Sequence, residues 1–310
     1  MSDLGALAKK ISASPQVTIL LHQQPDGDAI GSGVALALAI KDQAEVTIVS
    51  VDEPPKAFRD ICGQIIFSAK LPEKADLIIA VDVGELYRTG FGKILSNPKN
   101  AGSIALIDHH ATGDIAKIAQ YSYCRSASAT AELVFDLLSE LRVEITPPIA
   151  TALLLGLYTD TGGFQHQNTS SSLLKLAGRL VSYGGNLNLI SRSLRNQTSQ
   201  KQKRLWGYVL DKVTINRYGL ANARLSLKEL ENYQAEYQDL AGLANYLSLI
   251  SEDRAVCLTV EDKNGWRTIL RTRHANINLS RLAKLFGGTG TKKIAGFTVT
   301  KDLFSSKISE

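Results

Sequence analysis

The first half of the chain alternates short apolar runs with stretches of helical periodicity. Apolar residues follow one another without alternation at 17–22, 46–52, 77–83 and 104–109, as in strands buried on both faces of a sheet. Helical spacing of apolar residues follows at 31–41, 127–141, 149–160 and 171–183. This βαβ rhythm predicts an α/β fold with a mainly parallel sheet flanked by helices, and functional sites of such sheets lie at the carboxyl ends of the strands.

The second half has a different pattern, beyond a polar, basic stretch at 186–204. Strands are predicted at 212–218, 220–225, 255–261, 266–273 and 296–300, and helices at 235–250 and 279–285. This mixture predicts a smaller α+β domain. We therefore expect one domain at 1–186 and a second at 205–310, joined by a basic linker or connecting helix at 187–204.

The charges of the two halves have opposite signs. Residues 1–160 contain 13 Lys and Arg against 19 Asp and Glu, a net −6, and the remainder contains 22 against 11, a net +11. The stretches 161–210 and 265–301 contain no acid, but seven and eight basic residues. Scattered Lys and Arg usually only solvate exposed surfaces, but two acid-free stretches favour a polyanionic substrate or partner.

Cysteine usage and hydropathy bear on the compartment. The three cysteines are widely spaced without a CxxC pair, which favours a reducing compartment over a disulfide framework. The longest apolar runs, such as 34–40 and 150–158, are far shorter than the roughly 18 residues of a membrane span. The first apolar run is too short and badly flanked for a signal peptide. We expect a cytoplasmic protein without a membrane partner.

Candidate metal ligands follow the first predicted strand directly. His22, Asp26 and Asp28 fall within seven residues, with Gly27 between the two carboxylates and a helix after them. An Asp at this place could also be a helix N-cap, which is an equally good explanation of the loop taken alone. The sequence leaves both interpretations open at this point.

Three further strand or helix ends carry similar residues. Asp82 ends an almost wholly apolar run, where an unpaired carboxylate would be costly to bury. Asp108, His109 and His110 follow the run at 104–107, and adjacent histidines after an aspartate favour a site, although lone histidines are more often structural. Asp160 ends an apolar helix, where its charge opposes the macrodipole. It could alternatively cap the glycine turn that follows.

Together these residues predict a centre for two divalent ions. Two such ions would balance the four carboxylates of Asp26, Asp28, Asp82 and Asp160, which would otherwise repel one another. His22 and His109 add imidazole nitrogens. A set of oxygen and nitrogen ligands without sulfur suits Mn²⁺ or Mg²⁺ better than structural zinc, with Mn²⁺ preferred here. Paired ions are typical of phosphate-ester hydrolysis.

The ordered motifs resemble those of the DHH phosphoesterase family. They are HQQPDGDAIGS, the strand-terminal Asp82, DHH at 108–110, and YTDTGGF around Asp160. FGGTGTKKIAGF in the second half is similar to the glycine-rich signature of the DHHA1 domain. Length and layout are nearest to the family's short-oligonucleotide hydrolases, the NrnA-like nanoRNases. The resemblance implies an N-terminal DHH domain, a C-terminal DHHA1 domain, and a substrate held between them.

The resemblance also implies residue roles. One metal would be bound by His22, Asp26 and Asp82, and the other by Asp28, Asp82, His109 and Asp160, with Asp82 bridging. His110 would contact the scissile phosphate and Asp108 would orient the histidines. In the second domain the substrate would be held by Arg271, Thr272, Gly287, Gly288, Gly290 and Thr291. Thr291 replaces the histidine of the usual GGGGH signature, and Thr289 and Ile294 also depart from the family pattern.

The implied activity is metal-dependent hydrolysis of short oligoribonucleotides to mononucleotides, together with adenosine 3′,5′-bisphosphate. Alternatives are a cyclic dinucleotide phosphodiesterase and a pyrophosphate or polyphosphate hydrolase, although the SRKKQ signature of the pyrophosphatase branch is missing. A nucleic-acid-binding module without turnover is the non-enzyme alternative, and it would require a broken metal site. GGTGTKK lacks P-loop spacing. The oligomeric state, a homodimer included, and the direction of cleavage stay open.

Overall fold

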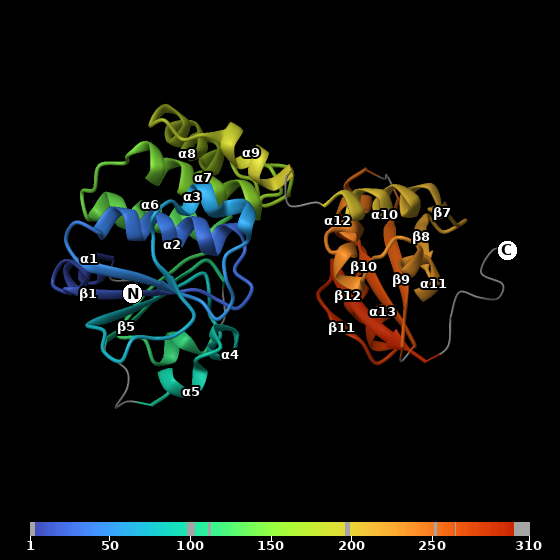
Figure 1. Cartoon of the computed structure of the whole chain (residues 1–310), viewed down its shortest axis with the longest axis horizontal. Coiled ribbons are helices and arrows are strands. Elements are labelled where there is room, and N and C mark those ends of the chain that lie inside the picture. Colours follow the sequence, from blue (N-terminus) through green and yellow to red (C-terminus); the bar gives the residue numbers. More distant parts are fainter. Residues whose placement is uncertain are drawn as a thin grey trace. The chain divides into compact units, whose positions relative to one another are not determined.

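The chain forms two compact units. The computed structural model describes residues 4–97, 103–110, 113–195, 199–250, 253–263 and 265–300. The units are Met1–Gln197 and Thr198–Glu310 (Figure 1). The boundary lies within the predicted connection at 187–204. That segment contains helix α9 (Leu187–Arg195) of the first unit and the start of helix α10 (Gln200–Asp211) of the second.

The first unit is built on a parallel sheet of six strands among the described residues, in the order β3-β2-β1-β4-β5-β6. The strands are β1 (Gln16–Leu20), β2 (Glu45–Val49), β3 (Phe67–Ser68), β4 (Leu77–Val81), β5 (Ser103–Asp108) and β6 (Tyr121–Cys124). The predicted α/β fold with a mainly parallel sheet is confirmed. Successive strands are added to one side of β1 up to β3 and to its other side from β4 onward. At such a reversal of strand order, a crevice for ligands is expected beyond the carboxyl ends of the two central strands.

Helices cover both faces of this sheet (Figure 1). They are α1 (Leu4–Ser12), α2 (Gly27–Ile40), α3 (Arg59–Cys62), α4 (Leu86–Thr89), α5 (Gly92–Leu95), α6 (Thr130–Glu140), α7 (Pro147–Asp160), α8 (Ser171–Ser182) and α9, with 3₁₀ turns η1 (Lys56–Phe58) and η2 (Ile115–Lys117). Alternate strand residues feed two cores: Ile19 joins the large core under α1, α2, α6 and α7, whereas Leu20 joins the smaller one on the opposite face.

Small residues bring α2 and α7 into close contact. A Cβ atom added to Gly31 of α2 would lie 2.3 Å from the carbonyl oxygen of Ala152 in α7. A Cβ added to Gly156 of α7 would lie 2.5 Å from a carboxylate oxygen of Asp28 in α2. A larger side chain at either glycine would force the helices apart. The pair of glycines therefore sets how near Asp28 lies to the end of α7.

The second unit is a smaller α+β domain around a mixed sheet. Its strands have the order β11-β12-β10-β9-β8-β7, and β8 and β9 are the parallel pair. The strands are β7 (Thr214–Ile215), β8 (Leu220–Leu225), β9 (Ala255–Asp262), β10 (Gly265–Arg271), β11 (Thr289–Gly290) and β12 (Ile294–Val299). The helices are α10, α11 (Leu227–Asn232), α12 (Leu243–Ile250) and α13 (Leu279–Lys284), with the 3₁₀ turn η3 (Tyr237–Leu240).

Two predicted elements of this unit are wrong. The strand expected at 212–218 is reduced to β7, because α10 runs through Asp211 and a turn closes from Asn216 to Gly219, which has φ +73°. The helix expected at 235–250 is divided into η3 and α12 by Gly242, whose φ of +87° is incompatible with a right-handed helix. Among the described residues, no helix is both long and apolar enough to cross a membrane.

Candidate metal centre

The predicted ligands of the first unit converge at the carboxyl ends of three neighbouring strands. His22 follows β1, Asp82 follows β4, and Asp108 ends β5. These strands lie side by side in the order β1, β4, β5. The site therefore occupies the point where the strand order reverses, as expected for an open parallel sheet. The end of α7 adds Asp160.

Asp26 serves both as a helix cap and as a candidate ligand. Its Oδ1 accepts hydrogen bonds from the amides of Asp28 (3.0 Å) and Ala29 (3.1 Å) at the start of α2. Its Oδ2 lies 3.9 Å from Nε2 of His22. Burial would raise the pKa of Asp26, but His22 and the two amides outweigh it and lower the pKa. The cap interpretation is therefore confirmed for Oδ1, and the ligand role of Oδ2 stays a prediction.

Asp28 is a buried carboxylate that joins two helices. Its Oδ2 accepts the amide of Thr130 at 2.6 Å, and its Oδ1 accepts the amide of Ala131 and the hydroxyl of Ser32, each at 3.1 Å. The two amides form the first turn of α6, whose positive dipole end favours an anion. Burial and the charge of Asp160 nevertheless raise the pKa of Asp28 to about 7. A nearby cation would remove this conflict.

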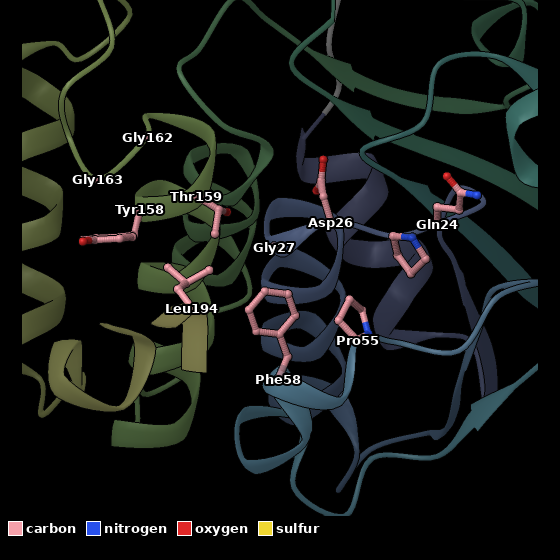
Figure 2. A pocket seen from close by; sticks show the side chains of 11 residues that line it. Gln24, Asp26, Gly27, Pro55, Phe58, Tyr158, Thr159, Gly162, Gly163 and Leu194 are labelled. Atoms are coloured by element: carbon pink, nitrogen blue, oxygen red, sulfur yellow. The ribbon is translucent and has the colours of Figure 1, made fainter. Parts of the chain in front are cut away.

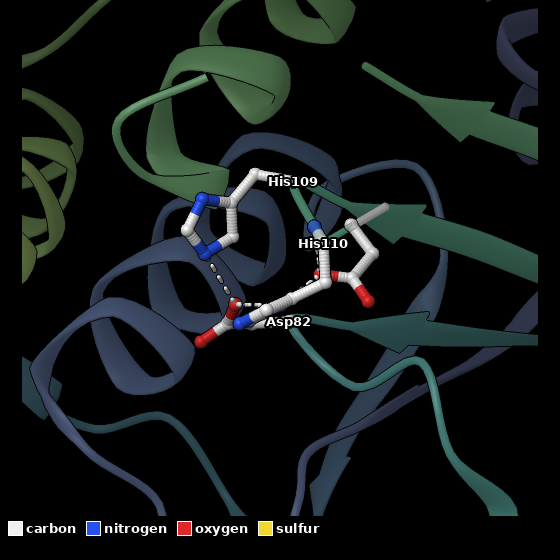
Figure 3. A group of neighbouring side chains, drawn as sticks. Asp82, His109 and His110 are labelled. Carbon is white, nitrogen blue, oxygen red and sulfur yellow. Dashed lines mark hydrogen bonds and ion pairs between the residues drawn. The ribbon is translucent and has the colours of Figure 1, made fainter. Parts of the chain in front are cut away.

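Asp82 lies at the centre of the group. Its backbone adopts φ +59°, a strained conformation for a residue with a side chain, and its amide donates to the carbonyl of Ile107. Its Oδ1 is 3.6 Å from Nε2 of His109 (Figure 3). Its Oδ2 is 4.0 Å from Nε2 of His22. Burial and the neighbouring charge of Asp28 raise its pKa well above the ordinary value. Each oxygen thus faces a different histidine, as a bridging ligand requires.

His22 and His109 both direct Nε2 toward Asp82. Nδ1 of His22 lies 2.7 Å from the carbonyl of Gln23, and Nδ1 of His109 lies 3.1 Å from that of Ala127. A carbonyl oxygen can only accept, so Nδ1 carries the proton in each ring and Nε2 keeps its lone pair. Backbone anchoring of the second nitrogen is typical of metal-binding histidines.

Asp108 holds His110 in place. Its Oδ1 accepts hydrogen bonds from Nδ1 of His110 at 2.7 Å and from the amide of His110 at 3.1 Å. Asp108 is 1% exposed, whereas the His110 side chain is half exposed. The hydrogen bond to Asp108 raises the pKa of His110. The arrangement leaves Nε2 of His110 for an external partner.

Asp160 faces His109 and does not use its carboxylate to cap the following turn. Its Oδ2 lies 3.7 Å from Nε2 of His109. The turn that follows instead uses its main-chain carbonyl, which accepts a hydrogen bond from Nδ1 of His166 at 3.3 Å. Burial raises the pKa of Asp160, and His109 partly offsets that effect.

The geometry therefore contains sets of side chains that could hold metal ions. Three groups of ligand atoms each lie within 4.8 Å of one another: His22, Asp26 and Asp82; Asp28, His109 and Asp160; and Asp82, Asp108, His109 and His110. The first group is the set implied for one ion, and the second contains three of the four residues implied for the other; the fourth, Asp82, is grouped with His109 in the third set. The fit rests on the oriented Nε2 atoms and on carboxylates whose burial demands a compensating charge.

Thr130 was missed in the sequence. Its hydroxyl donates to Oδ1 of Asp82 at 2.8 Å, and its amide donates to Asp28. This residue connects both inner carboxylates to the start of α6. A threonine in the first turn of the helix predicted at 127–141 was the available signal, but only the fold brings Thr130 next to Asp82.

The two threonines predicted to bind substrate in the second unit make hydrogen bonds within that unit. Thr272 is 5% exposed, and its hydroxyl donates to the carbonyl of Arg254 at 2.5 Å and accepts the amide of His274 at 3.1 Å. The hydroxyl of Thr291 accepts the amides of Lys293 and Ile294 within its own turn, at 3.4 and 3.3 Å.

Arg271 and the glycines complete this set. Burial lowers the pKa of Arg271, whose Nη1 donates to Asn245 at 3.2 Å. Gly288 and Gly290 pack closely on β12, because an added Cβ would lie 2.2 and 2.4 Å from its backbone. Gly287 has φ +70° after α13. The substrate roles of these residues stay predictions.

Comparison with known proteins decides the family. Residues 16–157 match the DHH family, N-terminal domain. The chain is 31% identical to the bifunctional oligoribonuclease and PAP phosphatase NrnA of Thermus thermophilus, over 91% of this chain and 84% of that protein. The chain belongs to the DHH family. Its resemblance is to the NrnA-like members: the protein of the same name from Mycoplasma pneumoniae is 28% identical, over 94% of this chain and 91% of that one.

The fold of the DHH chain is also found in solved structures. An exopolyphosphatase-related protein from Bacteroides fragilis superposes with a TM-score of 0.83, covering 98% of this chain and 91% of that one at 24% identity. This likeness shows that the two chains share a fold across both units.

Proposed function

We propose that this chain is a metal-dependent phosphodiesterase that hydrolyses short oligoribonucleotides to mononucleotides and also dephosphorylates adenosine 3′,5′-bisphosphate. The observation that carries the proposal is Asp82, whose two oxygens face the oriented Nε2 atoms of His22 and His109. The names of the Thermus and Mycoplasma relatives support the substrate class. The net charge of +11 after residue 160 suits a polyanionic substrate.

The proposed roles follow the two ligand groups. His22, Asp26 and Asp82 would hold one divalent ion, and Asp28, His109, Asp160 and Asp82 the other. The oxygen and imidazole ligands of these groups would suit Mn²⁺, which when bound would supply Lewis-acid chemistry for phosphate-ester hydrolysis.

The chain's own residues position the reaction. The Asp108 carboxylate fixes the His110 ring by its bond to Nδ1, so that Nε2 can donate to a phosphate oxygen of the substrate. Thr130 holds Oδ1 of Asp82, which keeps the shared carboxylate from rotating. In the second unit we assign substrate binding to Arg271, Thr272, Thr291 and the glycines at 287, 288 and 290.

We place the activity in the cytoplasm. Cys62, Cys124 and Cys257 are all free thiols, and Cys124 is exposed. A reducing compartment preserves exposed thiols of this kind.

A panel of substrates tests the proposal. Purified protein with Mn²⁺ is offered labelled RNAs of about two to five nucleotides, adenosine 3′,5′-bisphosphate, cyclic dinucleotides and pyrophosphate. We expect the short RNAs to be hydrolysed fastest. Faster cleavage of cyclic dinucleotides or pyrophosphate would favour an alternative activity, and no hydrolysis at all would overturn the enzyme assignment.

A further inference from the structure

A cavity of about 470 Å³ lies beside the metal centre, within the first unit (Figure 2). Its walls come from the loop after β1, the η1 segment, the end of α7 and helix α9. Figure 2 shows Tyr158 and Leu194 on one side and Pro55 and Phe58 on another. Asp26, a candidate metal ligand, belongs to the same lining. The cavity therefore adjoins the candidate metal centre at Asp26.

The composition of the lining decides what kind of group fits. Among the described residues that line the cavity there is no Lys, Arg or His, and Asp26 is the one acid. A phosphate would find no positive partner in such a space. Pro55, Tyr158 and Leu194, with the edge of the largely buried Phe58, make the rest of the wall mainly apolar. A planar, uncharged group suits these walls, and the volume lies within the range of small-molecule pockets.

Polar groups at the edge suit a nucleoside. The lining includes Gln24 and Tyr158, whose side chains can each donate and accept hydrogen bonds. Gln24 adopts a left-handed backbone with φ +52°, and its backbone amide donates a hydrogen bond to Oδ2 of Asp52 at 2.9 Å. The Thr159 hydroxyl, by contrast, donates to Leu155 in its own helix at 2.9 Å.

We propose that this cavity is the subsite for the nucleobase of the nucleotide whose phosphate is cleaved. The assignment rests on the proposed function, because it takes the scissile phosphate to lie at the metal centre. The base lies between the Phe58–Pro55 wall and the Tyr158–Leu194 wall. Recognition by flat apolar contacts tolerates different bases, since every base has an aromatic face.

The test follows the Leu194 methyl groups by NMR in the full-length protein, without hydrolysis. Their signals are assigned by their loss in Leu194→Phe. Adenosine, which has a base but no phosphate, is expected to shift them. Ribose 5-phosphate, which has a phosphate but no base, is expected to leave them unchanged. Unmoved Leu194 signals with saturating adenosine would overturn the subsite, whatever the protein hydrolyses.

A second experiment uses a variant with a larger side chain that fills the cavity. Leu194→Trp is expected to raise the KM for a 5′-phosphorylated diadenylate about tenfold, from the loss of base contacts, with the melting temperature unchanged. Leu174→Trp is the matched control, since Leu174 lies on α8 with 49% exposure and is outside the cavity lining. If Leu194→Trp unfolds the protein, Leu194→Phe is used. Equal KM values for folded Leu194 and Leu174 variants would contradict the proposal. Absence of any diadenylate hydrolysis by the wild type would instead refute the proposed function, and the NMR result would still decide the subsite.

Discussion

The candidate metal centre of the first unit and the residues predicted to bind substrate in the second unit differ in how their polar groups are used. In the first unit, Nδ1 of His22 and Nδ1 of His109 are bound to carbonyls, and each Nε2 faces a carboxylate. In the second, the hydroxyls of Thr272 and Thr291 are bound within the fold. In the first unit the Nε2 atoms are oriented for binding, whereas in the second unit the two hydroxyls make hydrogen bonds that stabilise the local fold.

This difference separates two kinds of sequence motif. Asp28 and Asp82 are buried carboxylates whose raised pKa values show that their charge is not compensated by their hydrogen bonds, which favours a bound cation. Glycines such as Gly288 are already explained by the close approach of β12. The geometry therefore supports metal binding by the first unit more directly than it supports substrate binding by the second unit. The variants below test that difference.

The largest effect is expected at Asp82. Asp82→Asn keeps the size of the side chain and the bond to Thr130, but it removes the charge that would be shared between two ions. We expect hydrolysis to fall by more than about 10³-fold. Because the buried charges of Asp82 and Asp28 repel each other, the metal-free variant should also melt at a higher temperature than the wild type.

The control for this variant is Asp60→Asn, at an exposed position on α3. It should leave both rate and melting temperature unchanged. An Asp82→Asn protein with wild-type turnover would contradict the bridging role.

Asp108→Asn is expected to have the next largest effect. The charge that fixes His110 through Nδ1 is lost, and the rate should fall by about 10²-fold while the metal content stays the same. Steady-state kinetics and metal analysis of the same sample provide the measurement. Loss of metal in parallel with activity would make Asp108 a ligand and not a positioning residue.

Thr130→Val removes the hydroxyl that holds Oδ1 of Asp82. We expect about a tenfold weaker Mn²⁺ affinity, measured by calorimetric titration, because such supporting bonds tune metal sites. Thr130→Ser should restore the wild-type affinity. Equal affinities for the Val and Ser variants would show that the hydroxyl has no such role.

Thr291→His places an imidazole in the turn between β11 and β12 of the second unit. We expect a few-fold change in the relative rates for short RNA and adenosine 3′,5′-bisphosphate, since imidazole adds a donor that can carry charge. Metal content should not change, because Thr291 belongs to the other unit. An unchanged substrate profile would show that position 291 does not read the substrate.

The smallest effect concerns stability of the second unit. Burial opposes the change, but Lys212 and the capping bonds with Ser226 lower the pKa of Glu229 to about 2 from an ordinary 4.5. Its contribution to stability is therefore fully present above about pH 4.5 and is lost as the pH falls toward 2. Glu229→Gln should cost less than about 1 kcal/mol at neutral pH, as for exposed ion pairs. A pH-independent difference in chemical denaturation would contradict this account.

The strands and the convergence of the candidate ligands at their ends were predictable because they depend on local pattern. The run at 77–83 is wholly buried up to Asp82, so both the strand and the unusual position of the carboxylate could be inferred. The role of Thr130 could not, since it depends on α6 meeting β4 across 48 residues. The cavity was also missed, because Pro55, Tyr158 and Leu194 are unremarkable until four separate segments meet. The break at Gly242 was hidden by continuous helical periodicity on both sides.

Anomalous diffraction from crystals grown with Mn²⁺ tests the central claim most directly. The account predicts two manganese peaks in the first unit, one beside His22 and Asp26 and the other beside His109, Asp28 and Asp160. Both peaks should lie within coordination distance of Asp82. A single peak, or two peaks of which either lies away from Asp82, would contradict it.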